Sequence, residues 1–291
     1  MRQSPALCWV VACSLTFAMV AVTDLAAADE SADRTGPIRL DVRWLAPADG
    51  GGDASEEKTA SRELLPAKTA ILICDVWDKH WCVSATRRCD ALARKTAPLI
   101  DQARARGVRI IHAPSDTLDF YRDHPARRRA LEVTVATPPF AIEPGCGLDR
   151  KREGSLPIDD SDGGCDCLPP CKNVNFKAWS RQHPAITIND RDLISDSGKE
   201  VYNYLVAEKI DNIIYLGVHT NMCVLGRSFG IRQMTRLGFN TLLVRDLTDT
   251  MYNPRRRPMV EHEQGTELVV RHIERYWCPT TLSASLAEGL R

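Results

Sequence analysis

Cys223 lies where the sequence pattern changes from a strand to a helix, a position at which a thiol can act as a nucleophile. An apolar run from Ile213 to Leu216 ends at Gly217, and helical spacing then continues to Gly238. Backbone N–H groups in the first turn of a helix are unpaired and favour negative charge, so this spacing predicts a stabilised Cys223 thiolate. The same N–H groups could hold the oxyanion of a tetrahedral intermediate. The alternative interpretation is that Cys223 is a small buried apolar residue.

A carboxylate stands directly after a second apolar strand. The run Ala70–Cys74 is continuous and apolar, and Asp75 follows it. An attacking thiol needs a base, and an amine that leaves an amide needs a proton, so one carboxylate could serve both steps. Open α/β folds bind their ligands at the carboxyl ends of parallel strands. We therefore interpret Asp75 as the base and acid that works with Cys223.

Alternating strands and helices must position these two residues. The pattern predicts an α/β fold with a mostly parallel sheet, because each strand is followed by a helix that can cross back over the sheet. Residues 48–61 are predicted to be structureless, and the segment 113–172 is too long for a usual crossover, so we interpret it as a Cys-rich insertion over the active-site end. The predicted strands cover residues 38–44, 70–74, 108–112, 185–188, 213–216 and 241–244, and the predicted helices cover 90–106, 197–210, 222–238 and 260–278.

The ends and the composition of the chain limit its organisation. Residues 1–28 carry Arg2, an apolar stretch and a closing run of three alanines, which is typical of a cleaved secretory signal peptide; a retained membrane anchor is the less favoured alternative. We predict an extension and linker over residues 29–68 and a single α/β domain over residues 69–291. The formal net charge is zero, which gives no global electrostatic case for binding nucleic acid.

The cysteine count fits an exported chain. Two of the eleven cysteines, Cys8 and Cys13, would leave with the signal peptide. Setting Cys74 and Cys223 aside, we predict disulfides among the remaining seven, an odd number that leaves at least one unpaired. A zinc site is the less favoured alternative, because the Cys-x-Cys spacing is tighter than usual. The seven are Cys82, Cys89, Cys146, Cys165, Cys167, Cys171 and Cys278.

Three short segments resemble the isochorismatase-like cysteine hydrolases, which include nicotinamidases and N-carbamoyl amidohydrolases. The segments are GVHTNMCV with the later VRDLTDT, ILICDVWDKHWC, and NFKAWS. The resemblance implies a three-layer αβα, Rossmann-like fold and a catalytic triad of Asp75, Lys177 and Cys223. Lys177 is assigned because the family carries a lysine three residues before a serine, here Ser180.

The same resemblance implies an oxyanion hole and a pocket. The family has a non-proline cis peptide where Val218 and His219 stand, so the backbone N–H groups of His219 and Cys223 would form the hole. The His219 side chain would either reach into the pocket or cover it. The predicted pocket side chains are Trp77, His80, Trp179 and His219. Where many members read Asp-x-Gln, this chain has Asp75, Val76, Trp77 and Asp78, and this departure puts the wall of the pocket in question.

A metal site is a further expectation that the sequence supports only in part. Nicotinamidases carry an Asp-x-His and a later His after the second core strand, and this region contains His112, Asp116, Asp119 and His124. These residue types suit zinc, but the Asp-x-His spacing is absent. We therefore expect that no cofactor is required, with zinc as the alternative.

The combined prediction is an exported cysteine hydrolase that cleaves the C–N bond of a small amide or carbamoyl compound through a Cys thioester. Its expected partner is a small-molecule substrate, with no nucleic acid, no membrane beyond the signal peptide, and assembly into a homo-oligomer as in its relatives. The alternative from another class is a non-catalytic secreted binding or structural module on the same fold. A redox role for the cysteines is a third hypothesis, which rests only on their number.

Overall fold

The continuous apolar strands predicted from the sequence assemble into one sheet of eight strands. A computed structural model describes residues 1, 36–48, 55–174 and 176–291. The strand order is β2-β1-β8-β7-β6-β3-β4-β5. The six strands from β8 to β5 run parallel, while β1 pairs antiparallel with both β2 and β8. Their bounds are β1 Ile38–Pro47, β2 Ser55–Leu64, β3 Thr69–Cys74, β4 Arg109–Ala113, β5 Leu193–Ile194, β6 Asn212–Val218, β7 Asn240–Asp249 and β8 Thr280–Thr281.

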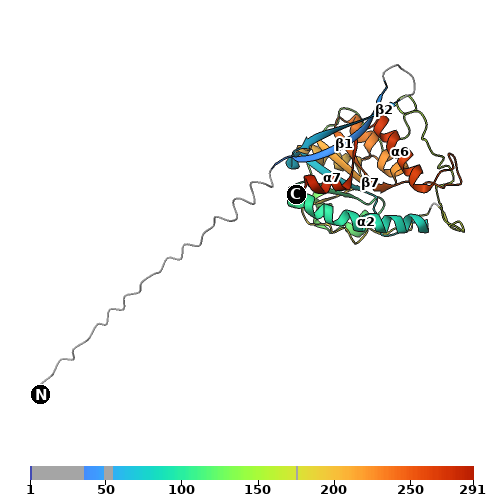
Figure 1. Cartoon of the computed structure of the whole chain (residues 1–291). Coiled ribbons are helices and arrows are strands. Elements are labelled where there is room, and N and C mark those ends of the chain that lie inside the picture. The colour runs from blue at the N-terminus through green and yellow to red at the C-terminus, as the bar shows by residue number, and fades with distance from the viewer. Residues whose placement is uncertain (2–35, 49–54, 175) are drawn as a thin grey trace. The chain divides into compact units, whose positions relative to one another are not determined.

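Helices cover both faces of this sheet. They are α2 Val83–Ala105, α3 Pro125–Glu132, α4 Gly198–Ala207, α5 Ile231–Arg236, α6 His262–Tyr276 and α7 Ser283–Gly289, with short turns η1 Pro66–Lys68, η2 Leu118–Tyr121 and the π-helical η3 Thr220–Val224. Figure 1 shows α2 and α7 on one side of the strands and α6 on the other. Among the helices of the described residues, none is long and apolar enough to cross a membrane.

The alternation of side chains along β3 explains the three layers. Successive side chains of a strand point to opposite faces. Leu72 therefore packs in the core beneath α4, α5 and α6, whereas Ile71 and Ile73 pack in the core beneath α2 and α7. All six residues of β3 are buried, as expected for a strand with helices on both faces. The predicted α/β fold with a mostly parallel sheet and a Cys-rich insertion is confirmed.

Several predicted elements match the structure and three do not. The predicted helices over 90–106, 197–210 and 260–278 correspond to α2, α4 and α6. The continuous helix predicted after Met222 is wrong, because η3 ends at Val224 and α5 begins only at Ile231. Residues 55–61, the later part of the segment predicted as structureless, belong to β2, which pairs along its whole length with β1. Residues 185–188 form no strand, and β5 lies further along instead.

The predicted boundaries at the N-terminal end also change. The hairpin of β1 and β2 joins the main sheet through β8, so much of the predicted extension over 29–68 belongs to the same compact unit as the rest. Its alternating residues Ile38, Leu40 and Val42 are buried against α7, which confirms the strand predicted over 38–44. The predicted signal peptide, with Cys8 and Cys13, lies outside the described residues.

A buried ion network fixes the insertion between β4 and β5 to the helices α5 and α6. Glu153 has no exposed side-chain surface and pairs with Arg232 at 2.7 Å. It also accepts hydrogen bonds from His272 Nε2 at 2.8 Å and Trp277 Nε1 at 2.8 Å. Burial alone would raise the pKa of Glu153, but these donors outweigh it and hold the pKa well below its usual range.

Replacing Glu153 by glutamine is expected to lower the free energy of unfolding by about 3 kcal/mol at neutral pH, since Arg232 would be left buried without a counter-ion. A carboxylate with a depressed pKa stabilises the fold above its unfolded pKa, and this stabilisation is lost as pH falls. The difference between wild type and Glu153→Gln should therefore shrink in acid. Urea unfolding at neutral and acidic pH measures it. The surface pair of Asp149 with Arg236 supplies the control, because Asp149→Asn should lower the free energy of unfolding much less than Glu153→Gln does.

Candidate active site

Asp75 and Cys223 lie close together at the carboxyl edge of the sheet, at the point where the order in which strands are added to the sheet reverses. β3 and β6 are paired neighbours, and the chain leaves β3 toward β4 on one side and leaves β6 toward β7 on the other. Ligands of open α/β sheets bind at such a switch point. Gly217 permits the close approach of the two strands, because a Cβ there would lie 2.0 Å from the carbonyl oxygen of Cys74.

The Asp75 carboxylate is completely buried, and both of its oxygen atoms have polar partners. It accepts a hydrogen bond from the backbone N–H of Ser115 at 2.7 Å and one from the Cys223 thiol. Its other oxygen lies 3.1 Å from Nε of Arg227. Burial raises the pKa of Asp75 above its usual range, although Arg227 and Ser115 oppose this effect. A carboxylate held in this way can receive the proton of the neighbouring thiol.

The pKa of Cys223 corrects the expectation of a resting thiolate. Burial and the adjacent Asp75 carboxylate raise the pKa of Cys223 to about 12, while Arg227 and the backbone N–H of His219 act in the opposite direction. The predicted helix dipole is missing because Cys223 lies in the short π-helical turn η3, separated from α5. At neutral pH the thiol is protonated, so a nucleophilic attack by its sulfur would require a nearby base.

His219 occupies the position that the family resemblance gave to the oxyanion hole. The Val218–His219 peptide bond is cis, and the backbone N–H of His219 donates to the Cys223 sulfur. Burial, and then the neighbouring His80, lower the pKa of His219 to about 3, so its ring is neutral. Its Nε2 atom is buried and has no hydrogen-bond partner among the residues that the structure describes. This atom is therefore available to a bound ligand.

The four predicted pocket side chains form one aromatic wall. The rings of Trp77 and Trp179 stack with centroids 4.1 Å apart, and His80 stacks on Trp179 at 5.7 Å. His80 also meets His219 edge to face at 4.9 Å. Burial lowers the pKa of His80 to about 4, so this wall carries no charge at neutral pH. The wall suits a neutral, flat group of a substrate.

Asp78 explains how Trp179 reaches this wall. Its carboxylate accepts hydrogen bonds from the backbone N–H of Ser180 at 3.0 Å and from the Ser180 hydroxyl at 2.6 Å. Trp77 also forms an isolated bridge with Gln182. The segment 179–182 is thereby aligned beside the residues that follow β3, where the chain departs from the family pattern at Trp77 and Asp78.

Arg227, which the sequence analysis missed, is the cation paired with Asp75, whereas Lys177 is exposed. Lys177 lies at the start of the segment that Asp78 anchors through Ser180, on its solvent side. Arg227 also approaches Asp116, with its Nη2 atom 3.7 Å from that carboxylate. Burial lowers the pKa of Arg227, but Asp75 and Cys223 outweigh this and raise it, so it stays charged. Arg227 could have been recognised from its position four residues after Cys223, since residues four apart lie on the same face of a helix.

Replacing Arg227 by methionine is expected to lower kcat/KM at least about tenfold, and Lys177→Met should leave it nearly unchanged. Without the guanidinium, the pKa of the buried Asp75 rises further, so a larger share of the carboxyl group is protonated at any given pH. The acid limb of the pH–rate profile should then move to higher pH. Initial rates of the two variants between acidic and alkaline pH measure this. A larger loss in Lys177→Met than in Arg227→Met would return the lysine to the triad.

The predicted metal ligands after β4 are not gathered into a site. Both ring nitrogens of His112 are occupied, by Gln182 at 2.9 Å and Asp192 at 3.0 Å. His124 caps α3 by accepting from the Ala126 N–H, and the Asp119 side chain is 99% exposed. Asp116 faces Arg227 instead. Within the described ranges, the only group of three or more residues placed to share a metal ion consists of Cys82, Cys165, Cys167 and Cys171.

The structure does not show the predicted disulfides. All nine cysteines of the described residues are free thiols. The sulfur atoms of Cys82 and Cys167 are 3.6 Å apart, well beyond the roughly 2.05 Å of a disulfide bond. Cys89 donates to the carbonyl oxygen of Trp77 rather than pairing with Cys82.

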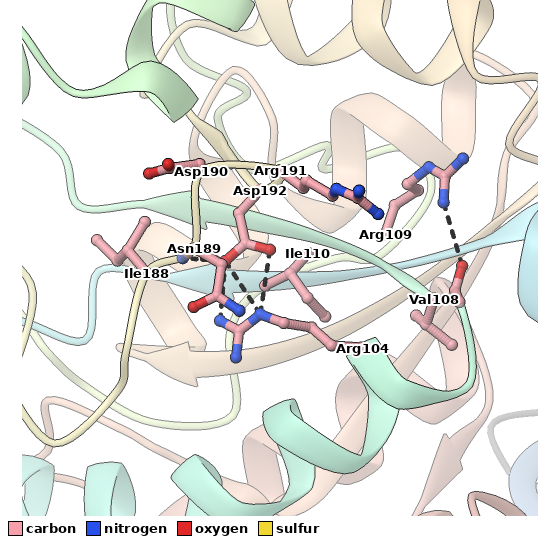
Figure 2. Close-up of a pocket in the computed structure, with 10 residues that line it drawn as sticks. Arg104, Val108, Arg109, Ile110, Ile188, Asn189, Asp190, Arg191 and Asp192 are labelled. Atoms are coloured by element: carbon pink, nitrogen blue, oxygen red, sulfur yellow. Dashed lines mark hydrogen bonds and ion pairs between the residues drawn. The ribbon is translucent and has the colours of Figure 1, made fainter. Parts of the chain in front are cut away.

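A surface hollow of about 610 Å³ lies at the opposite edge of the sheet and does not take part in this site. It is lined by residues around the start of β4 and the turn before β5. Figure 2 shows the guanidinium of Arg104 placed against the carboxylate of Asp192, and these two groups of the hollow form an ion pair at 2.8 Å. These groups are therefore committed to holding the fold.

The chain is similar to solved structures of cysteine hydrolases and isochorismatases. One is a cysteine hydrolase from Pseudomonas syringae pv. phaseolicola 1448A, at 17% identity and a TM-score of 0.48, covering 78% of this chain and 94% of that one. A second is an isochorismatase family protein from Burkholderia thailandensis, at 18% identity and a TM-score of 0.44, covering 77% and 96%. A third is an isochorismatase from Pseudomonas putida KT2440, at 13% identity and a TM-score of 0.44, covering 76% and 90%. The sequence matches no protein-family model and no curated protein.

Proposed function

We propose that this chain is a cysteine hydrolase that cleaves the C–N bond of a small amide or carbamoyl compound. The observation that carries the proposal is the contact of the Cys223 thiol with the buried Asp75 carboxylate, which Arg227 holds at the switch point of the sheet. A nucleophile, a base and a group that orients the base are the parts that covalent hydrolysis requires. The sequence resemblance around the same residues supports this reaction class.

The arrangement suggests how the first half of the reaction runs. Asp75 accepts the thiol proton as the Cys223 sulfur attacks the substrate carbonyl carbon and forms the C–S bond. The negative charge that develops on the carbonyl oxygen is held by the backbone N–H groups of His219 and Cys223. The tetrahedral intermediate then collapses. The C–N bond breaks, and ammonia or an amine leaves with the proton that Asp75 held.

The second half returns the enzyme to its starting state. A water molecule gives a proton to Asp75 and attacks the thioester carbonyl carbon. The C–S bond breaks, the acid is released, and the proton on Asp75 returns to the Cys223 sulfur. Arg227 remains charged throughout and keeps the Asp75 carboxylate in position. The reaction needs no cofactor.

The uncharged wall of Trp77, His80, Trp179 and His219 suggests the kind of substrate. Buried neutral rings pair well with a flat and neutral group, while the Nε2 atom of His219 can exchange a hydrogen bond with one polar atom of it. We therefore place compounds with a planar amide or ureido group first among the substrates to test.

We propose further that the chain acts outside the cytoplasm after cleavage of residues 1–28. The support is the pattern of Arg2, an apolar stretch and closing alanines. Mass determination of the protein recovered from an expression host checks this directly. A mature chain that begins at Asp29 agrees with the proposal, and an intact N-terminus in an exporting host contradicts it.

Ammonia release from a substrate panel tests the proposed activity. The panel contains nicotinamide, N-carbamoyl amino acids, biuret and ureido compounds, and the Cys223→Ala variant is the control. We expect turnover of at least one compound by the wild-type chain. Turnover that persists in Cys223→Ala would instead be due to a contaminant or to another site.

A non-catalytic binding module on the same fold is the second candidate function. The raised pKa of Cys223 and the exposed position of Lys177 favour it. It predicts that Cys223 reacts with iodoacetamide no faster than an ordinary thiol and that the whole panel is silent. Selective and rapid labelling of Cys223 that depends on Asp75 would exclude it.

A further inference from the structure

Four cysteine sulfur atoms meet beside the active site, although they come from two distant parts of the chain. Cys82 immediately precedes α2, and Cys165, Cys167 and Cys171 lie in the insertion between β4 and β5. Their sulfur atoms all lie within 4.8 Å of one another. The proposed hydrolysis uses none of them. Cys82, Cys165 and Cys167 are buried, and Cys171 is partly buried.

The spacing of these sulfur atoms fits a single tetrahedral metal ion. Zinc binds thiolate sulfur at about 2.3 Å, so two sulfurs on one zinc are about 3.8 Å apart. The sulfur atoms of Cys82 and Cys167 are 3.6 Å apart. An iron–sulfur cluster holds its thiolates on different irons and needs a wider arrangement than the four share here.

The start of α2 provides hydrogen bonds that thiolate ligands require. Its first N–H groups point at three different sulfurs of the cluster. The N–H of Ser84 donates to the Cys167 sulfur at 3.3 Å, and those of Val83 and Ala85 donate to Cys171 and Cys82. The Ser84 hydroxyl lies 3.1 Å from the Cys167 sulfur. Such bonds around the ligands orient them and offset their negative charge.

An ion pair holds the loop of cysteines in place independently of any metal. Asp166, between Cys165 and Cys167, pairs with Arg88 of α2 at 2.7 Å. Arg88 also pairs with Asp249 at the end of β7. The loop is therefore positioned against α2 by contacts outside the sulfur cluster, which prepares the four ligands for an ion.

We propose that Cys82, Cys165, Cys167 and Cys171 bind one structural zinc ion. Four protein ligands leave no open position for water or substrate, so the ion would stabilise the fold rather than take part in chemistry. It would fasten the insertion to the start of α2. Trp81 and Met251 are buried in the same cluster, and Trp179 and Met222 pack against it. The zinc site thereby supports the aromatic wall and the residue next to Cys223.

Zinc content and cobalt substitution test the site in the full chain. The wild-type protein, purified under reducing conditions, should hold about one zinc per chain, and cobalt(II) in its place should give the absorption of a tetrahedral thiolate site. Cys167→Ser and Cys171→Ser should lose the bound metal, and chelation should lower the melting temperature by about 10 °C. Cys89→Ala is the matched control, since Cys89 is a buried cysteine of α2 outside the cluster.

Each outcome decides the proposal. Metal bound by the wild type and by Cys89→Ala, together with a tetrahedral cobalt spectrum, supports it even if a cysteine variant fails to fold. Two results overturn it. The first is a wild-type chain that binds neither zinc nor cobalt after reduction, whether or not mass mapping finds disulfides among the four cysteines. The second is a folded Cys167→Ser variant that keeps its full metal content.

Discussion

A Cys223→Ala variant is expected to hydrolyse its best substrate at least about 10³-fold more slowly than the wild-type chain. The reason is that Cys223 is the thiol in contact with the Asp75 carboxylate. Cys74 directly precedes Asp75 and is a thiol too, but it is completely buried in β3 and its pKa is raised well above the usual value by burial. It cannot replace Cys223 in contact with a substrate.

Two further substitutions distinguish the loss of a nucleophile from the loss of packing in the core. Cys223→Ser keeps a group of similar size and its hydrogen bond to Asp75, yet a hydroxyl is a much weaker nucleophile, so activity should still fall steeply. Cys278→Ala removes a buried cysteine far along the chain from the site, and should change stability but not rate. Initial rates together with melting temperatures make the comparison. A Cys223→Ala variant with more than a tenth of wild-type activity contradicts the assignment.

An Asp75→Asn variant is expected to lose about 10²–10⁴-fold in kcat/KM, because the amide has the shape of the carboxylate but cannot accept the thiol proton. The loss should be large because the Cys223 thiol is protonated at neutral pH, its pKa being raised to about 12 by burial and by Asp75. Removing the negative charge of Asp75 lowers the pKa of Cys223. Activity of the variant should therefore recover in part at alkaline pH.

The acid side of the pH–rate profile identifies the base. The pKa of Asp75 is raised by burial, and the reaction requires the ionised carboxylate. The wild-type kcat/KM should therefore fall as pH decreases through this raised pKa, and the limb should be absent in Asp75→Asn. Steady-state rates across the pH range provide the measurement. The assignment fails if the same acid limb persists in the variant.

The sequence predicted the parts of the site that continuous buried strands fix. Ala70–Cys74 and the run before Gly217 are apolar enough to be recognised as core strands, and parallel neighbours must place Asp75 and Cys223 at one edge. The aromatic side chains Trp77, His80 and Trp179 were also brought together as predicted for the pocket. The apolar pattern of the strands therefore predicted the edge of the sheet at which Asp75 and Cys223 lie.

The features of the site and the fold that the sequence did not predict depend on contacts between polar side chains that are distant in the sequence. The pairing of Arg227 with Asp75 was missed because it joins two side chains that are far apart in the sequence. The pairing of β2 with β1 was missed because its residues are polar and mostly exposed. The cysteines were predicted as disulfides from their number, whereas their distances depend on how the insertion folds back onto α2.

The covalent intermediate on Cys223 gives the most direct test of the central claim, that the chain hydrolyses amides through a thioester. The measurement is the intact mass of the protein, quenched in acid during turnover of a substrate found in the panel, followed by mapping of the modified peptide. We predict a mass gain equal to the acyl group of the substrate, located on Cys223 and absent in Cys223→Ala. Sustained turnover with an unmodified Cys223, or with the acyl group on another residue, would contradict the account.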